Sequence, residues 1–533
     1  MSTGLCEEIA GRIADPRRVA VREQTGHTWS WDGLLGAAED LAGRLRGRGP
    51  LRLVAARTSR PVLTLVATLA CDLLEVPLVH LDSGQTEAEY ARIGAAFGPH
   101  LLLSDPGPGP GPGPGPGAEP TWERDGLSAA VSASGGEGGG GGGSAAEGSA
   151  FGSPRSGIFL TSGSTGEPAG VVRSARAQLA DALRCAAFLE YGPTTPVVCA
   201  APVVHAYGYT LGMLAPLLSG APVTLCGSRL VPSQLAAAVR DAGARVLIAL
   251  PFHYRLMAAD TTSRFDGLER AVSAGAPIPA GAAEAVTKAH GFALLNNYGS
   301  SETGAITIKR VDPAHDRPGD VGRPLPGLVA SLRDVGEEGG AGELLLATDS
   351  LADGYAHADG MRPLSLHGDL LRTGDLATLA PDGSVRLVGR LARMVNVGGK
   401  KVNPVEVERV LAEHPAVTEA QVFAAEDGGR GQVPVARVAA PGPVTADALI
   451  GWCRERLAEH KIPRRVEVLA ELPRSATGKV LSPHAQGRPG GRTAPGPVAR
   501  SAVESATEPT AESAAERQAA ERQAAERQKE GSA

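Results

Sequence analysis

The sequence predicts an α/β fold, with a large N-terminal domain of layered sheets and helices followed by a small α+β C-terminal domain. Three observations support this prediction. The chain has 533 residues, which is too long for one ordinary hydrophobic core. Helical spacing alternates with short apolar runs typical of buried strands through most of the chain. Near residue 370 this pattern gives way to a hairpin, and a compact unit of strand and helix patterns follows.

Net charge and cysteine spacing indicate which kinds of binding partner and which cellular compartment the sequence favours. The formal net charge is −6, from 52 basic and 58 acidic residues, which favours neither a nucleic-acid groove nor an anionic membrane surface. The six cysteines are scattered without a C-x-x-C pair, a pattern typical of reduced thiols in a cytosol. The N-terminus shows no signal peptide. We therefore expect a cytoplasmic protein without nucleic-acid or membrane partners, and the oligomeric state stays open.

The first hundred residues alternate between helix and strand patterns. Residues 28–47 have helical apolar spacing, with Ser30 as the expected N-cap. The apolar segment 61–81 is interrupted by Asp72 and Glu75, so it is too short to span a bilayer and predicts a buried helix followed by a strand. Gly- and Pro-rich insertions at about 104–120 and 133–149 are expected to be disordered.

From residue 157 the α/β pattern resumes. Ile158 to Leu160 form a short apolar strand, and the runs at 245–250 and 291–299 predict buried parallel strands. Residues 372–390 predict a hairpin that turns at 381–383. The large domain is therefore expected to span residues 1–389.

The small domain is expected over residues 395–482. Asn403, Pro404 and Glu406 fit the N-cap, N1 and N3 positions of a helix that stops before Pro415. Strand patterns at 432–438 and 464–472 flank an amphipathic helix pattern at 445–460. The tail, 483–533, ends in three copies of AAERQ, a five-residue period that builds no apolar face, so we expect disorder.

The stretch "GIFLTSGSTGEPAGVV" (157–172) places hydroxyls and glycines directly behind an apolar strand. Such a turn offers many donors to polyphosphate oxygens at little steric cost. It is not a Walker loop, because no Gly-Lys-Ser/Thr follows at the required spacing. Taken by itself, the stretch is equally consistent with an ordinary Ser/Gly loop.

Seven further segments accompany this loop in order, and together they resemble the motifs of the adenylate-forming superfamily. That superfamily comprises acyl- and aryl-CoA synthetases, adenylation domains of non-ribosomal peptide synthetases, and firefly luciferase. The resemblance covers nearly all of residues 20–482 outside the Gly/Pro tracts. The segments are VVHAYGY (203–209), SAGAP (273–277), NNYGSSETG (296–304), GELLLATDSLADGY (342–355), RTGDLATLAPDGSVRLVGR (372–390), VNVGGKKVNPVEVE (395–408) and PRSATGKV (473–480).

The resemblance implies a two-step reaction. A carboxylate attacks the α-phosphorus of ATP, giving an acyl-adenylate and pyrophosphate, and a thiol then forms the thioester. The implied cofactors are ATP, Mg²⁺ and coenzyme A, or a carrier-protein phosphopantetheine in place of coenzyme A. The small domain is implied to be mobile, swinging about a hinge at 390–394 that contains Arg393.

The resemblance also assigns roles to particular residues. Lys479 bridges the substrate carboxylate and the α-phosphate, Glu302 binds Mg²⁺, and His205 has a catalytic or gating place in the substrate pocket. Asp375 and Arg390 bind the ribose, and Tyr298 lies against adenine. The nucleotide-binding set comprises Thr161, Ser162, Gly163, Ser164, Thr165, Gly166, Ala274, Gly275, Ala276, Asn297, Tyr298, Gly299, Ser301, Asp375 and Arg390. The pocket set comprises His205, Tyr209, Phe252, His253 and Gly275, and the thiol tunnel passes Gly398 and Gly399.

The chain departs from the family pattern at the hinge and at the phosphate loop. At the hinge, Arg393 stands where the family has Asp or Lys, and Asn396 occupies a position that is commonly basic. Ala169 stands where the phosphate loop usually has a lysine, and Arg173 and Arg176 are close enough in sequence to compensate.

The pocket motifs at 201–210 and 250–256 contain no acid to hold an α-amino group. A bare ammonium in an apolar pocket is costly, so a carboxylic acid without an α-amine, aryl or short acyl, is the expected substrate.

Three functions remain open at this point. The first is an acyl- or aryl-CoA ligase. The second is a stand-alone adenylation enzyme that loads a carrier protein. The third is a nucleotide- or acyl-binding regulatory protein with little turnover, which Ala169 and Asn396 motivate.

Overall fold

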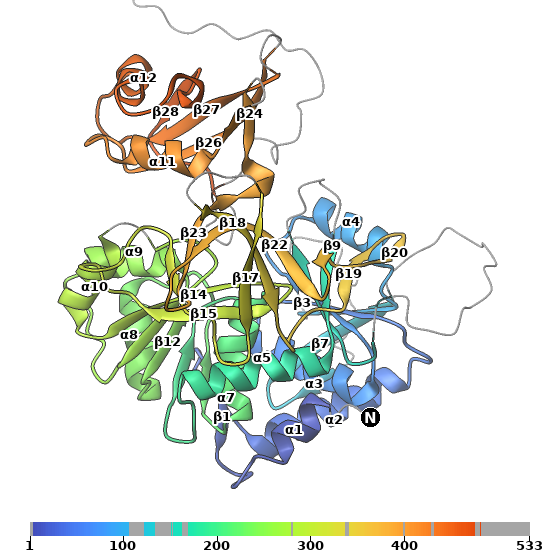
Figure 1. Ribbon diagram of the computed structural model, residues 1–533. Helices are drawn as coiled ribbons and strands as arrows, with labels where there is room; N and C mark the ends of the chain where they lie inside the picture. The colour runs from blue at the N-terminus through green and yellow to red at the C-terminus, as the bar shows by residue number, and fades with distance from the viewer. Residues whose placement is uncertain are drawn as a thin grey trace, which may run out of the picture. The chain divides into compact units, whose positions relative to one another are not determined.

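The computed structural model describes residues 4–105, 122–133, 151, 153–161, 169–278, 281–335, 340–397, 400–427, 431–474 and 480. All of them belong to one compact unit, Met1–Gln486. They form four sheets with helices packed on them, which confirms the predicted α/β class (Figure 1). The predicted disordered tail and most of both Gly/Pro-rich insertions lie outside the described residues. Within that described part, no helix combines the length and apolar character needed to cross a membrane.

The first sheet has eight strands in the order β15-β14-β13-β12-β10-β11-β1-β2. The six inner strands run parallel, and β2 and β15 close the edges in antiparallel fashion. The strands are β1 (Val19–Glu23), β2 (Thr28–Ser30), β10 (Val197–Cys199), β11 (Val223–Leu225), β12 (Val246–Ala249), β13 (Arg270–Ser273), β14 (Ala293–Ser300) and β15 (Gly304–Arg310). The runs at 245–250 and 291–299 thus form buried strands, as their apolar character predicts.

Helices cover both faces of this sheet. One face packs on a core cluster that includes Leu235, Tyr254 and Val286, from three successive helices. The other face joins the main core of the large domain. The helices after β9 and before β14 are α5 (Ala175–Phe188), α6 (Ala206–Tyr209), the π-helical turn Thr210–Leu214, α7 (Ala215–Leu218), α8 (Pro232–Ala242), α9 (Pro251–Ala259) and α10 (Ala282–His290).

The second sheet has nine strands in the order β20-β19-β9-β8-β4-β3-β5-β7-β6. Its parallel centre is β8-β4-β3-β5. The strands are β3 (Val54–Thr58), β4 (Leu78–Asp82), β5 (Leu101–Ser104), β6 (Trp122–Arg124), β7 (Leu127–Ala133), β8 (Gly157–Thr161), β9 (Ala169–Arg173), β19 (Gly354–His357) and β20 (Gly360–Arg362). Helices α3 (Pro61–Leu74) and α4 (Glu87–Phe97) pack against its strands. Helix α2 (Trp31–Arg46) contacts β6 of this sheet and also β1 and β2 of the first, and α1 (Leu5–Ala10) packs on α3.

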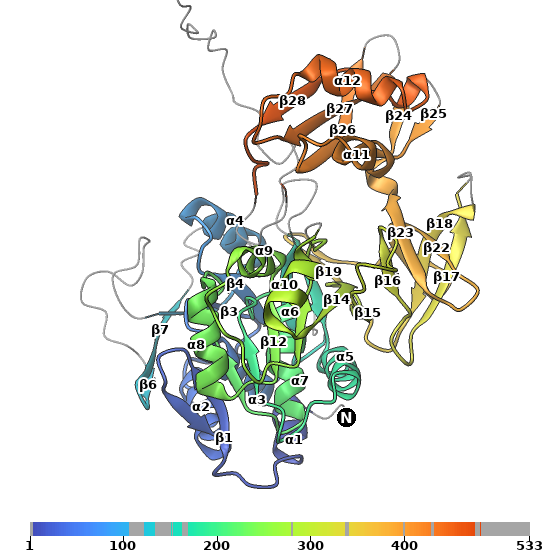
Figure 2. The ribbon, with the colours of Figure 1, turned by 90° about the vertical axis from the view of Figure 1, so that its left-hand side faces the viewer.

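The third sheet is antiparallel, in the order β16-β23-β22-β18-β17, and β21 pairs with β22. Its strands are β16 (Asp320–Gly322), β17 (Val329–Asp334), β18 (Gly342–Ala347), β21 (Leu366–His367), β22 (Leu370–Leu379) and β23 (Val385–Arg390). The predicted hairpin is the β22–β23 pair, in which Asp375 lies opposite Arg390. Figure 2 shows these strands beside the β14–β15 end of the first sheet.

The fourth sheet lies within the predicted small domain and has the order β25-β24-β27-β26, with β28 beside β27. Helix α11 packs against β26 and helix α12 against β28. The elements are the 3₁₀ turn Leu391–Arg393, β24 (Val395–Val397), β25 (Lys400–Val402), α11 (Pro404–Ala412), β26 (Glu419–Asp427), β27 (Gly431–Ala439), α12 (Ala446–Arg454), the 3₁₀ turn Glu459–Lys461 and β28 (Val466–Leu469). The domain bounds and the hinge stay predictions.

Local capping chemistry sets the helix starts that the sequence predicts. The Ser30 side chain accepts a hydrogen bond from the Gly33 amide at the start of α2, and Asn403 accepts one from Val405 at the start of α11. The second amphipathic helix is shorter than its sequence pattern, because α12 ends at Arg454 and a separate 3₁₀ turn follows. All six cysteines are free and buried, as expected for reduced thiols.

Candidate active site

The predicted site segments follow the carboxyl ends of parallel strands. In the first sheet, the segments after β10, β12, β13 and β14 contain the predicted pocket, adenine and metal residues. In the second sheet, β8 leads into the predicted phosphate loop and β4 ends at Asp82. Carboxyl ends of parallel strands share one edge of a sheet, where α/β proteins bind ligands. The fold therefore gathers motifs that lie far apart in the sequence.

Asp375 is the centre of a hydrogen-bonded group that joins the first and third sheets. Its Oδ2 accepts a hydrogen bond from the Tyr298 hydroxyl at 2.6 Å, and its Oδ1 accepts one from Arg390 Nε at 2.5 Å. Asp375 is 5% exposed. Burial, and after it the Asp375 carboxylate, raise the pKa of Tyr298 well above its ordinary value, so this hydroxyl stays a donor. Three residues assigned to ATP thus lie in direct contact.

Glu302 lies in the tight turn between β14 and β15. The Ser300 hydroxyl lies 3.1 Å from that of Thr303 and accepts the Thr303 amide, which closes the turn. Gly299 and Gly304 flank it, and both positions exclude a side chain. A Cβ on Gly299 would lie 2.3 Å from the Gly304 carbonyl oxygen, and one on Gly304 would lie 1.8 Å from Asp181 Oδ2. This close packing fixes the backbone that carries Glu302.

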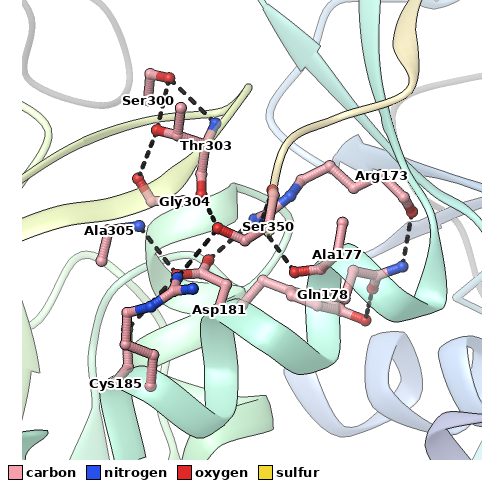
Figure 3. A network of polar contacts seen from close by, with 12 residues as sticks. Arg173, Ala177, Gln178, Asp181, Cys185, Ser300, Thr303, Gly304, Ala305 and Ser350 are labelled. Atoms are coloured by element: carbon pink, nitrogen blue, oxygen red, sulfur yellow. Dashed lines mark hydrogen bonds and ion pairs between the residues drawn. The ribbon is translucent and has the colours of Figure 1, made fainter. Parts of the chain in front are cut away.

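A buried ion pair supports the Glu302 turn from below (Figure 3). Arg173 Nη1 donates to Asp181 Oδ2 at 3.1 Å, and both side chains are almost fully buried. Asp181 Oδ1 accepts the Ala305 amide at 3.1 Å, while Arg173 Nη2 donates to the carbonyls of Ala177 and Ser350. Every one of these contacts is internal to the fold. The structure therefore gives no support to Arg173 as a substitute for the phosphate-loop lysine, because its buried guanidinium binds internal partners.

The Glu302 side chain has a partner that the sequence does not reveal. Tyr355, on β19 of the second sheet, donates its hydroxyl to Glu302 Oε1 at 2.9 Å. Burial raises the pKa of Tyr355 above its ordinary value, and the negative charge of Glu302 adds to this effect. The Ala352 amide donates to the Glu302 carbonyl at 2.8 Å. Tyr355 on β19 therefore holds the side chain of Glu302, and Ala352, in the connection that precedes β19, holds its backbone.

His205 precedes helix α6 and faces a carboxylate from the other sheet. Its Nε2 lies 3.7 Å from Asp82 Oδ2, an ion-pair distance. The neighbouring His205 imidazole holds the pKa of the Asp82 carboxyl below its ordinary value. An acid therefore does lie near the predicted pocket, although neither pocket motif contains one. Asp82 enters from β4.

The remaining predicted pocket residues differ in exposure. Phe252 is half-buried, with its ring centroid 3.8 Å from that of His253. His253 is buried, and its Nδ1 accepts the Leu250 amide at the start of α9. Tyr209 is 1% exposed, and its hydroxyl donates to Gln178 at 2.5 Å. Since these contacts are internal, the contact of Tyr209 and His253 with a substrate stays a prediction.

The predicted adenine segment follows β13 directly. Ala274 is 3% exposed, while Gly275 and Ala276 form an exposed or half-buried bend. Asn297 on β14 is 8% exposed, and Ser301 is half-buried in the Glu302 turn. The placement of these residues at one sheet edge fits the nucleotide set, and their roles stay predictions.

Several predicted residues lie outside the described part of the chain. These are Lys479, the phosphate-loop residues 162–166 and the tunnel glycines 398 and 399. Thr161 is the last residue of β8 and pairs with Ala169, which opens β9 and is 9% exposed. Arg176 is exposed near the start of α5 and stays a candidate for the missing lysine.

Sequence patterns missed three residues that the structure places at or under the site. Asp82 could have been found, since it ends a strand pattern at the edge where pocket motifs gather. Tyr355 ends one of the family motifs, but no role was expected for it. Asp181 lies on a helix with no local signal of its partner, Arg173.

Comparison with protein families gives two matches. A model described as AMP-binding enzyme matches residues 12–356, and a model described as AMP-binding enzyme C-terminal domain matches residues 406–479. These matches include His205, Glu302 and Lys479, while Asp375, Arg390 and the two tunnel glycines lie in the stretch between them.

Curated relatives share about a third of their residues with this chain. A 3-[(3aS,4S,7aS)-7a-methyl-1,5-dioxo-octahydro-1H-inden-4-yl]propanoyl:CoA ligase of Rhodococcus jostii is 32% identical over 337 residues, covering 61% of this chain and 64% of the relative. A sulfoacetate–CoA ligase of Cupriavidus necator is 30% identical over 336 residues, covering 61% and 65%. The chain thus spans just under two thirds of the length of these two relatives.

Solved structures share the fold over most of the chain. ATP-bound MatB from Rhodopseudomonas palustris has a TM-score of 0.74 at 22% identity, covering 90% of this chain and 97% of that one. O-succinylbenzoate coenzyme A synthetase (MenE) from Bacillus subtilis, in complex with ATP and magnesium ion, has a TM-score of 0.70 at 23% identity, covering 90% and 98%. At this level of identity the likeness establishes the architecture.

Proposed function

The chain belongs to the AMP-binding enzymes of the adenylate-forming superfamily, and from this premise we propose that it is an AMP-forming acid–thiol ligase. In the first step, the carboxylate of the substrate attacks the α-phosphorus of ATP and pyrophosphate leaves. In the second step, a thiol attacks the acyl carbon and AMP leaves. Coenzyme A is the proposed acceptor, as in the names of the curated relatives.

One observation carries this proposal. Tyr298 and Arg390 both donate to Asp375, and Glu302 lies only four residues beyond Tyr298, in the turn after the same strand. A buried carboxylate with a fixed orientation can accept hydrogen bonds from the two ribose hydroxyls. The nearby Glu302 would meet the phosphates of the same nucleotide. Strand β14 thus contacts the Asp375 carboxylate through Tyr298 and leads directly into the turn that carries Glu302, an arrangement that supports an ATP site.

The residues at the turn fit a magnesium ion. Glu302 is a half-buried carboxylate with Oε1 engaged by Tyr355, and hard oxygen ligands of this kind suit Mg²⁺. The described residues contain no cluster of three or more metal-ligating side chains. That agrees with Mg²⁺, which is held by one or two carboxylates together with substrate phosphates and water. When bound, the ion neutralises charge on the phosphates of ATP.

The pocket geometry supports a substrate acid without an α-amino group. Asp82 is the carboxylate with which His205 forms an ion pair among the described residues, so its oxygens are already engaged by that imidazole. An ammonium group would have to compete with His205 for the same oxygens. We therefore propose an aryl or short acyl carboxylic acid, with His205 and Phe252 at the pocket.

Product analysis tests this function. The full chain is incubated with ATP, Mg²⁺, coenzyme A and a panel of aryl, acyl and amino acids, and the products are identified by mass spectrometry. We expect an acyl-CoA together with AMP for at least one acid that lacks an α-amine. Acyl-adenylate that accumulates with coenzyme A and transfers only to a phosphopantetheinyl carrier would overturn the CoA assignment. Absence of AMP with every acid would favour the regulatory alternative.

A further inference from the structure

Residues 350–355, which lead from β18 to β19, bind the turn that carries Glu302. The Ser350 hydroxyl donates to the Thr303 carbonyl at 2.8 Å, and the Ala352 amide donates to the Glu302 carbonyl at 2.8 Å. Ser350 is fully buried. We name residues 350–355 the bridging segment. Its first half fixes the backbone of the Glu302 turn.

The second half of the bridging segment binds the strand that leaves the phosphate loop. The Asp353 amide donates to the Val172 carbonyl at 2.8 Å. Strand β19 then pairs antiparallel with β9, so that Tyr355 lies opposite Val171. Strand β9 starts at Ala169, three residues after Gly166, the last of the predicted phosphate-binding residues. The bridging segment therefore ties two parts of the nucleotide site to each other.

Tyr355 extends this connection to the Glu302 side chain. The Tyr355 hydroxyl donates to Glu302 Oε1 at 2.9 Å, and the Tyr355 side chain is half-buried. A glutamate has three rotatable side-chain bonds, so a carboxylate at a turn is poorly oriented unless a partner holds it. A donor on Oε1 restricts these bonds and leaves Oε2 to face a ligand. Outer-shell partners of metal-binding carboxylates act in this way in many metal sites.

We propose that Tyr355 is a positioning residue that orients the Glu302 carboxylate for Mg²⁺ and so sets the Mg²⁺ concentration that the enzyme requires. The inference rests on the proposed function of Glu302. It goes beyond that function by assigning the metal requirement to a residue on a different sheet. Because β19 pairs with β9, the orientation of the carboxylate is also tied to the position of the strand behind the phosphate loop.

The test compares Tyr355→Phe with the wild type in ATP–pyrophosphate exchange over a range of Mg²⁺ concentrations. We expect the half-saturating Mg²⁺ concentration to rise about tenfold, with the maximal rate largely restored at high Mg²⁺. Tyr191→Phe is the matched control, since its buried hydroxyl donates to the Leu211 carbonyl at 3.1 Å, within the main core. The control should leave the Mg²⁺ requirement unchanged.

A binding measurement provides a readout that does not depend on turnover. Mn²⁺ is titrated into each variant with a non-hydrolysable ATP analogue, and free Mn²⁺ is followed by electron paramagnetic resonance. Tyr355→Phe should bind Mn²⁺ about tenfold more weakly than the wild type. If wild-type exchange is present and the two variants have equal Mg²⁺ and Mn²⁺ dependence, the inference is overturned. Absence of exchange in the wild type itself would instead overturn the proposed function.

Discussion

The hydroxyl of Tyr298 donates a hydrogen bond to Asp375 Oδ2 at 2.6 Å, although 77 residues separate the two in the chain. Tyr298 lies on β14 of the first sheet and Asp375 on β22 of the third. Arg390 engages the other carboxylate oxygen at 2.5 Å. Asp375 is therefore fixed from two sides before any nucleotide binds, and such preorganisation reduces the cost of binding.

Replacing Tyr298 with Phe should weaken ATP binding. The variant keeps the ring but removes the donor to Asp375, and hydrogen bonds to charged groups contribute about 1.5–3 kcal/mol. We expect KM for ATP to rise about tenfold or more, with a smaller change in kcat. Tyr254→Phe is the control, because its buried hydroxyl donates to the Val272 carbonyl at 2.8 Å. If Tyr298→Phe and Tyr254→Phe have the same KM for ATP, the Tyr298 hydroxyl does not contribute to nucleotide binding.

Breaking the ion pair between Arg173 and Asp181 should destabilise the large domain. Asp181→Asn leaves the enclosed Arg173 guanidinium without a counter-charge, which costs about 3–5 kcal/mol for buried pairs. Urea unfolding measures this loss. The control Asp349→Asn removes an exposed partner of Arg184 and should cost at most about 1 kcal/mol. A loss for Asp181→Asn no larger than that of the control would contradict the structural role of the pair.

The stability of the protein should fall in mild acid partly because of His80. This side chain is 2% exposed, and among the described residues neither ring nitrogen has a hydrogen-bond partner. Burial lowers the pKa of His80 to about 3, and the nearby His205 adds to the shift. Between pH 6.5 and 3 the unfolded chain therefore binds the proton that the folded chain excludes, so stability decreases as pH falls.

The variant His80→Phe tests this dependence. His80 stacks on Phe159 at 4.8 Å, so a phenyl ring can occupy the same place. One excluded proton contributes at most about 1.4 kcal/mol per pH unit. We expect the plot of unfolding free energy against pH, measured from pH 6.5 to 4.5, to be shallower for His80→Phe by up to this slope. Parallel plots for the two proteins would show that folding does not lower the pKa of His80.

Two substitutions at Ala169, one with a charged and one with an uncharged long side chain, test whether the missing lysine limits the rate of pyrophosphate exchange. Ala169 is 9% exposed and opens β9, so a larger side chain costs about 1–3 kcal/mol of stability whether or not it is charged. We expect Ala169→Lys to exchange pyrophosphate at least as fast as the wild type, and up to about tenfold faster than Ala169→Met at subsaturating ATP. If the Lys and Met variants behave alike, charge at this position does not contribute.

The sequence predicts most of the elements around the site but few of the contacts across it. Apolar runs and caps are local, so the strand at 246–249 and the N-caps Ser30 and Asn403 follow from a few neighbouring residues. The pair Tyr355–Glu302 depends instead on which strands become neighbours. Such long-range pairing is decided by the whole fold.

The behaviour of Arg173 and Asp82 illustrates the same limit. Sequence distance suggested that Arg173 could reach a phosphate, but its side chain is enclosed beside Asp181 and Ser350. The pocket motifs contain no acid, yet Asp82 arrives from another sheet and lies 3.7 Å from His205. Closeness in sequence was therefore a poor guide to the position of the Arg173 charge. The motifs alone did not reveal the charge of Asp82.

The central claim is that this chain forms acyl-adenylates. The most direct measurement is the exchange of labelled pyrophosphate into ATP by the full chain with Mg²⁺ and single carboxylic acids, including amino acids for comparison. Lys479→Ala serves as the blank, because the family resemblance places this lysine at the reacting carboxylate. We predict that at least one aryl or short acyl acid stimulates pyrophosphate exchange by the wild type. The same acid should give no exchange with Lys479→Ala. Absence of exchange with every acid, under conditions where the protein is folded, would contradict it.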